Sequence, residues 1–177
     1  WENGVLYIGK HLISTKWNTL SGDYTIKPGT VSIAQHAFAS CSKVTNIDIP
    51  DSVKYISDYA FTGCSALTSI SIPEGVPRIG DSMFSECNRL EIVNIPDSVT
   101  YIGHNAFNDC KIKSIVISDH VTSIGKYAFQ NCRELTDINI PESVKSIGIQ
   151  AFNNTGYYNT ESNWENGALY IGRHLIS

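Results

Sequence analysis

One pair of residue columns constrains this chain more than any other feature. Phe recurs at intervals of 23, 23, 23, 22 and 23 residues, and Cys follows three residues behind each Phe except the last, where Thr155 stands. Every Phe and every Cys belongs to these columns, which are Phe38, Phe61, Phe84, Phe107, Phe129 and Phe152, and Cys41, Cys64, Cys87, Cys110 and Cys132. A fixed period of this length is typical of proteins built from stacked repeats. We therefore expect a solenoid of about six 23-residue repeats.

The rest of the repeat predicts a β-rich coil. In the copy around position 75, an I-x-I pair alternates with period two and is followed by Pro73, which has no N–H with which to continue a strand. A V-x-x-I-G segment follows and ends at Gly80, a residue that can turn the chain. The A-F-x-x-C segment spans about one helical turn and predicts a short helical or 3₁₀ piece. One unit cannot bury its own apolar face, so the copies are expected to stack into parallel sheets.

A second repeat encloses the first. The block W-E-N-G-V-L-Y-I-G-K-H-L-I-S at 1–14 returns at 164–177 with changes only at Val5/Ala168 and Lys10/Arg173. The Asn-Gly pairs at 3–4 and 166–167 predict hairpin turns. We expect a β-hairpin insert with its lead-in at 1–20, the solenoid at 21–156, and the start of the next hairpin insert at 157–177. The chain opens at Trp1 with no starting Met or signal peptide, so we expect a fragment of a longer tandem array.

Composition excludes several function classes. The formal net charge is -4, which gives no broad positive field for nucleic acid. No apolar run approaches the roughly 20 residues that span a bilayer, so no membrane insertion is expected within this fragment. No H-E-x-x-H, G-x-S-x-G or Gly-rich phosphate loop occurs. We therefore expect no catalytic activity and no cofactor.

The repeats resemble a known family. The stretch L-T-S-I-S-I-P-E-G-V-P-R-I-G-D-S-M-F-S-E-C at 67–87, with its neighbours over about 21–156, resembles the BspA-like, or Treponema pallidum-type, leucine-rich repeats. The resemblance implies a right-handed leucine-rich-repeat coil in a cell-surface or secreted protein of host-associated bacteria. It also implies adhesion to extracellular matrix proteins or other cells, without naming a partner or an active site. The departures Ser57, Met83, Ser118 and Thr155, and the residue missing between Cys110 and Ile112, are scattered.

Alternation in the strands predicts a candidate binding surface. If the I-x-I residues point inward, the outward strand positions are Asn46, Asp48, Ser69, Ser71, Ile92, Asn94, Ser114, Val116, Asp137 and Asn139. This surface is small and polar with an apolar spot at Ile92 and Val116, and an ordinary solvated sheet face is the alternative interpretation. A second set is aromatic, which interfaces favour: Tyr55, Tyr59, Tyr101 and Tyr127.

Two further columns could in principle hold metal. Zinc needs converging ligands, whereas the Cys residues point the same way from successive coils, and parallel Cβ atoms about 4.8 Å apart exceed the usual ~3.8 Å of a disulfide. We expect five buried free thiols. A carboxylate column follows the Pro column: Asp51, Glu74, Asp97, Asp119 and Glu142. Stacked acids could collect Ca²⁺, but turn chemistry explains Asp followed by Ser better, so no metal is expected.

The leading functional hypothesis is a non-catalytic, extracellular or cell-surface repeat protein that binds protein partners such as matrix or host-cell proteins. A structural stalk that projects other domains is one alternative. A carbohydrate-binding module is another; it needs a cluster of exposed aromatic side chains, and finding the four Tyr residues of the aromatic set on one open groove would favour it.

Overall fold

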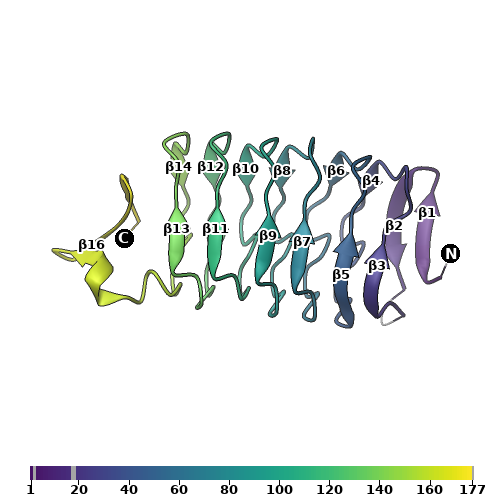
Figure 1. Cartoon of the computed structure of the whole chain (residues 1–177), viewed down its shortest axis with the longest axis horizontal. Coiled ribbons are helices and arrows are strands. Elements are labelled where there is room, and N and C mark those ends of the chain that lie inside the picture. The colour runs from purple at the N-terminus through teal and green to yellow at the C-terminus, as the bar shows by residue number, and fades with distance from the viewer. Residues whose placement is uncertain (2, 17–18, 177) are drawn as a thin grey trace.

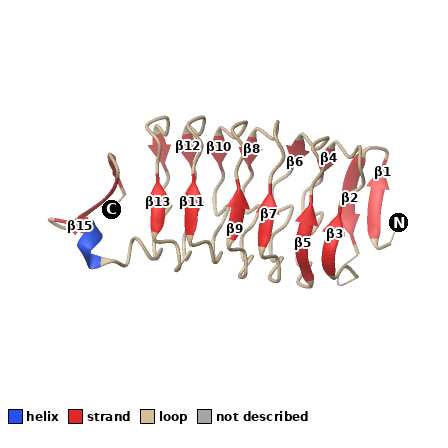
Figure 2. Cartoon of the chain, in the orientation of Figure 1, coloured by secondary structure: helices blue, strands red, loops and turns tan. Residues whose placement is uncertain are grey.

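The computed structural model describes residues 1, 3–16 and 19–176, and in it about six coils stack along one axis (Figure 1). Each coil contributes one strand to each of two parallel sheets, joined by turns, and each sheet is interrupted once, between β9 and β11 in one and between β6 and β8 in the other (Figure 2). The 3₁₀ helix Glu161–Asn163 is the one helical element in the described part of the chain. The prediction of a β-rich repeat solenoid is confirmed.

The two sheets come from different parts of the repeat. The long-strand sheet contains the I-x-I segments, which are Gly22–Thr25 (β3), Val44–Asp48 (β5), Ser69–Ser71 (β7), Ile92–Asn94 (β9), Ser114–Val116 (β11) and Asp137–Asn139 (β13). The short-strand sheet contains Ser32–Ile33 (β4), Tyr55–Ile56 (β6), Arg78–Ile79 (β8), Tyr101–Ile102 (β10), Ser123–Ile124 (β12) and Ser146–Ile147 (β14). Equivalent residues pair in register, as Ile47 does with Ile70 and Tyr101 with Ser123.

A ladder of stacked Phe rings fills the space between the sheets. All six Phe side chains are fully buried, and consecutive ring centroids lie 5.2 to 5.5 Å apart. Interplanar angles from 2° to 20° make these stacked pairs, which contribute about 0.5–1.5 kcal/mol each beyond the burial of their area. The Phe column is therefore the spine of the core.

The A-F-x-x-C segment is a succession of turns rather than a helix. Its backbone N–H groups donate to the carbonyl oxygen three residues earlier, as Cys64 N does to Phe61 O at 3.1 Å. The residue before the Ala-Phe pair and the residue before Cys both have positive φ, for example 59° at Tyr59 and 63° at Glu86. Left-handed residues cannot continue a right-handed helix, so each turn stops after one hydrogen bond.

The Gly residues that end the V-x-x-I-G segments let the backbones of adjacent coils approach closely; they do not reverse the chain direction. Gly125 has no positive φ, but a Cβ added there would lie 2.6 Å from the carbonyl carbon of Gly103 in the preceding coil. Real Cβ atoms do not approach backbone so closely, so only Gly fits. The expectation that this Gly turns the chain was wrong.

The two terminal blocks lie at opposite ends of the solenoid (Figure 1). At the N-terminal end, Val5–Ile8 (β1) pairs antiparallel with His11–Thr15 (β2), and β2 pairs in parallel with β4. At the other end, Trp164–Glu165 (β15), Ala168–Ile171 (β16) and His174–Leu175 (β17) form an antiparallel meander. Asn166 and Gly167 form the turn between β15 and β16, as predicted. The turns at Gly9 and Gly172 were not predicted.

Candidate binding surface

The outer side of the long-strand sheet carries the predicted strand positions. Alternation is clear in its exposure: Ile70 in β7 is 3% exposed, whereas Ile92 in β9 is 67% and Val116 in β11 is 81% exposed. The ten residues Asn46, Asp48, Ser69, Ser71, Ile92, Asn94, Ser114, Val116, Asp137 and Asn139 all reach the surface, with Asn46 and Ser69 half-buried. The placement is as predicted from period two.

Two adjacent hollows occupy most of this surface. The first, of about 470 Å³, lies over β5, β7 and β9, and the second, of about 290 Å³, lies between β9 and β11. Both are lined by Ile92 and Asn94, so they lie next to each other on the two sides of β9, and we call the pair the strand-face groove. Asp137 and Asn139 are not among the residues that line it.

The second hollow lies where the ladder of the long-strand sheet is broken. Strands β9 and β11 do not pair, although β7 pairs with β9 and β11 with β13. The break coincides with the short repeat: Lys111 N donates to Leu90 O at 3.1 Å, whereas in the next coil Thr136 N donates to Lys113 O. In consequence Val93, whose equivalents are buried, is half-buried at the floor of the second hollow.

The groove has an acidic lining. Asp48, Asp51, Glu91 and Asp97 contribute to it, and no Lys, Arg or His is among its lining residues. Asp97 accepts a hydrogen bond from the Ser118 hydroxyl at 2.9 Å. Positively charged groups can therefore approach the groove without meeting a basic side chain in its wall.

Glu91 is held by two lysines at one end of the groove. Its carboxylate lies 3.1 Å from Lys113 Nζ and 3.6 Å from Lys111 Nζ. The hydrogen bond and charge of Lys113 lower the pKa of Glu91, and Glu91 raises the pKa of Lys113 in return.

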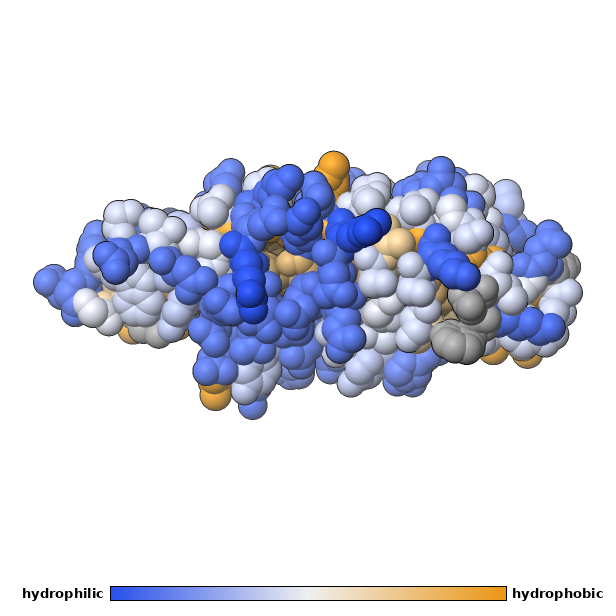
Figure 3. All heavy atoms as spheres, turned by 90° about the horizontal axis from the view of Figure 1, so that it is seen from below, coloured by the Kyte–Doolittle hydropathy of each residue, from blue (hydrophilic) through white to orange (hydrophobic). Residues whose placement is uncertain are grey.

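Seen from below, the molecule is polar along its length, with hydrophobic side chains only in separate spots (Figure 3).

Of the four predicted Tyr residues, Tyr55 alone lines the hollow on the short-strand side. Tyr55, 64% exposed, lines a separate hollow of about 320 Å³ on the short-strand side, and Tyr59, Tyr101 and Tyr127 are not among its lining residues. Tyr59 packs against His36 with ring centroids 5.0 Å apart, and burial raises the pKa of Tyr101. The hollow beside Tyr55 therefore gives no support from a shared aromatic groove to the carbohydrate-binding interpretation.

The hollow beside Tyr55 lies at a second break in the ladder, between β6 and β8. Its cause is Pro77. At the equivalent positions Thr100 and Thr122 donate backbone N–H bonds to the preceding coil at 2.9 Å, and Pro has no N–H to donate. The sequence contained this signal, since Pro77 is the one Pro within a V-x-x-I segment, but the prediction did not use it.

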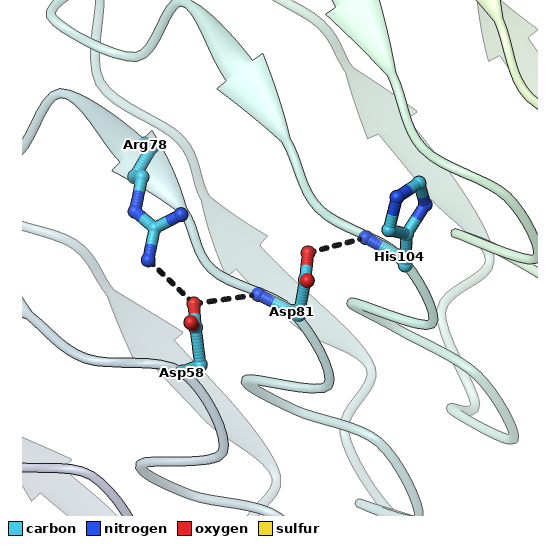
Figure 4. A network of polar contacts seen from close by, with 4 residues as sticks. All are labelled: Asp58, Arg78, Asp81 and His104. Carbon is cyan, nitrogen blue, oxygen red and sulfur yellow. Dashed lines mark hydrogen bonds and ion pairs between the residues drawn. The ribbon is translucent and has the colours of Figure 1, made fainter.

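A chain of polar contacts crosses this second break (Figure 4). Asp58 Oδ1 accepts a hydrogen bond from Arg78 at 2.6 Å and another from the backbone N–H of Asp81 at 2.9 Å. Asp81 Oδ1 in turn accepts from the N–H of His104 at 2.8 Å. Asp58 and Asp81 therefore each satisfy a backbone donor of the next coil, which is a structural role.

The five thiols are free and buried. Each of the last four donates to the carbonyl oxygen of the Phe in the preceding coil, at 3.0 to 3.3 Å. Burial raises the pKa of Cys41 to about 11, that of Cys132 to about 12 and that of Cys110 well above the ordinary value. The pKa of Cys64 is also raised, mainly by its interaction with the neighbouring Cys87 thiol and in second place by burial. Such thiols are poor nucleophiles and poor metal ligands.

The carboxylate column does not converge on an ion site. Among residues 1, 3–16 and 19–176, no three His, Cys, Asp or Glu side chains are grouped so as to hold a metal ion. Where Ser follows the acid, its hydroxyl bridges coils instead, as Ser98 Oγ does to Val76 O at 2.8 Å and as Ser52 and Ser143 do at the equivalent positions. Within the same described residues, no helix is long and apolar enough to cross a membrane.

Two sheets of stacked parallel strands around a Phe ladder, with an open outer strand face, define a leucine-rich-repeat solenoid. The chain belongs to the BspA-type leucine-rich-repeat family, because residues 16–133 and 100–174 match the BspA type leucine rich repeat region, in six copies. A comparison with curated proteins gave no match.

Several solved bacterial structures share the fold. A leucine-rich cell surface protein from Faecalibacterium prausnitzii is 38% identical over 73% of this chain, with a TM-score of 0.66. A leucine-rich repeat protein from Bacteroides ovatus is 30% identical over 86%, with a TM-score of 0.63. The T. pallidum leucine-rich repeat protein is 25% identical over 86% of this chain and 83% of its own, with a TM-score of 0.70. The chain spans 35% of the first structure and 48% of the second.

Proposed function

We propose that this chain is a protein-binding unit of a bacterial cell-surface repeat protein, and that it contributes to adhesion to matrix or host-cell proteins through the strand-face groove. The observation that carries the proposal is the groove itself, two neighbouring hollows over β5, β7, β9 and β11 that are lined by the exposed apolar residues Ile92 and Val116. The resemblance of the chain to the F. prausnitzii cell surface protein supports a location at the cell surface.

The size of the groove sets the strength of binding. Covering Ile92 and Val116 contributes about 1.5–3 kcal/mol each, and the polar groups around them mainly fix orientation. After the cost of association, a single groove supports weak binding. Several units in one protein raise the overall strength, because the second contact is made at a high effective concentration.

The test is a binding screen of the chain, immobilised at high density, against extracellular matrix proteins and host-cell surfaces. The double variant Ile92→Lys with Val116→Lys is compared with Ile149→Lys, a matched control because Ile149 is 65% exposed outside the groove. We expect saturable binding that weakens at least tenfold in the double variant and is unchanged in the control. No saturable binding, or equal loss in both variants, would contradict the proposal and favour the stalk.

A further inference from the structure

The two terminal blocks fold into the same hairpin at both ends of the chain. In the first, Tyr7 pairs with Leu12 and Ile8 with His11, and in the second, Tyr170 pairs with Leu175 and Ile171 with His174. The turn glycine has φ 58° in one block and 57° in the other. The sequence of the block therefore determines its hairpin independently of what the block packs against.

The two copies bury opposite faces of this hairpin. In the N-terminal block Leu12 is fully buried and Ile8 is 62% exposed. In the C-terminal block the equivalent of Leu12, Leu175, is 61% exposed, and the equivalent of Ile8, Ile171, is only 2% exposed. Cross-strand partners lie on one face of a hairpin and neighbouring pairs on the other, so these are two distinct faces.

The Leu12 face of the N-terminal block begins a solenoid. Strand β2 pairs in parallel with β4, which places Leu12 beside Ile33, and both are fully buried in the common core. The first coil is therefore covered by this block, while the opposite face, with Ile8, is left in solvent.

The Ile171 face of the C-terminal block covers the end coil, which carries β13 and β14. A Cβ on Gly172 would lie 4.0 Å from Ile140 O, and the Arg173 guanidinium lies 2.9 Å from the Glu142 carboxylate. The Tyr157 hydroxyl donates to Tyr170 O at 3.0 Å. Figure 1 shows this block beyond β13 and β14, at the end of the stack.

We infer that the block is a two-sided joint, and that the Ile8 face of the N-terminal block is a docking surface for the end coil of a second copy of this chain. The partner is defined within the molecule, because a block of nearly the same sequence already occupies that coil through the equivalent Ile171. In the docked pair Lys10, the counterpart of Arg173, faces Glu142 of the other copy. One block then has both faces buried, and two solenoids continue as one rod.

The intact chain is expected to remain a monomer. Its own C-terminal block is tethered to the end coil and competes at an effective concentration in the millimolar range for a short linker. The docking surface is therefore revealed when the tethered block is released. This inference does not depend on the strand-face groove, and the two can fail separately.

The full-length variant Ile171→Asp places a charge in the buried contact and releases the block. We expect head-to-tail association that grows with concentration in analytical ultracentrifugation, while the wild type stays monomeric. The double variant Ile8→Asp with Ile171→Asp is expected to stay monomeric with an unchanged circular dichroism spectrum. Equal association of the single and double variants, or none in the single variant, would overturn the inference.

A cross-linking experiment identifies the contact. Isotopically labelled and unlabelled Ile171→Asp chains are mixed and treated with a carbodiimide, which joins amines to adjacent carboxylates. A Lys10–Glu142 link between labelled and unlabelled chains is expected, and inter-chain links confined to other sites count against the docking surface. Arg173→Glu opposes Glu142 without altering the apolar face; because both side chains are largely exposed, it is expected to weaken the tethered contact only slightly and to give the same link at a much lower yield than Ile171→Asp.

Discussion

The residue type at the Phe, Cys and Gly positions of the repeat is determined by contacts with the adjacent coil. Phe stacks on Phe, the Cys thiol donates to the carbonyl of the preceding Phe, and the Gly column gives the backbone room. These contacts join one coil to the next, so a substitution in a column is expected to weaken the contact between coils rather than one turn alone.

Gly125→Ala tests the need for close approach. The new Cβ meets backbone of the preceding coil at 2.6 Å, and backbone cannot move aside as a flexible side chain can. We expect a loss of about 1–3 kcal/mol in the free energy of unfolding, measured by urea titration. Lys126→Ala, the exposed neighbour, is the control and is expected to stay within about 0.5 kcal/mol of the wild type. Equal effects of the two variants would contradict this role of Gly125.

The thiols predict a dependence of stability on pH. Burial raises the pKa of Cys132 from 9.0 to about 12, so the unfolded chain releases this proton at a lower pH than the folded chain. Its contribution is fully present below about pH 9 and is lost as the pH rises towards the folded pKa. Urea titrations at about pH 8 and pH 11 are expected to show a smaller loss in Cys132→Ala than in the wild type. The same loss in both proteins would exclude this thiol as a cause.

At the scale of the element, sequence reasoning was accurate where the repeat is regular and failed where it is not. The I-x-I alternation placed Ile92 and Val116 on the surface because period two leaves no other choice. The helical expectation for A-F-x-x-C failed because φ at Tyr59 and its equivalents depends on packing between coils. The groove could not be predicted either, since it arises from strands that fail to pair, and pairing is a property of two coils together.

Pro77→Thr tests the cause of the break between β6 and β8. The substitution restores the N–H that Thr100 and Thr122 use at this position, and the new bond is expected to contribute about 1 kcal/mol. Losing Pro costs about 0.4–1 kcal/mol through the entropy of the unfolded chain, so the net change in stability is small. Hydrogen exchange is the more direct measurement: the amides at positions 77 and 78 are expected to become protected. An unprotected amide at position 77 of this variant would show that Pro is not the cause.

At the scale of the whole molecule, each coil contacts only its neighbours, so stability is a sum over interfaces. The ring of Phe107 stacks on Phe84 at 5.5 Å and on Phe129 at 5.2 Å, whereas Phe152 has one described stacking partner, Phe129. A defect at the centre of the stack therefore weakens two interfaces, and a defect at the end weakens one.

Phe107→Ala and Phe152→Ala form a matched pair for this idea. We expect a loss of about 3–5 kcal/mol for the central variant and a smaller loss for the end variant. In calorimetry the central variant is also expected to unfold in two steps, because the lesion separates the coils before it from those after it. A single transition with equal losses in both variants would show that the stack unfolds as one unit.

The two breaks in the ladders are offset. Where β6 and β8 do not pair, β5 and β7 do, and where β9 and β11 do not pair, β10 and β12 do. Because the two breaks lie at different coils, every junction between the coils from β3/β4 to β13/β14 is crossed by at least one pair of hydrogen-bonded strands. A rod anchored at one end and pulled at the other should therefore peel from its ends coil by coil. Force spectroscopy that instead shows rupture into two halves at either break would refute this mechanical consequence.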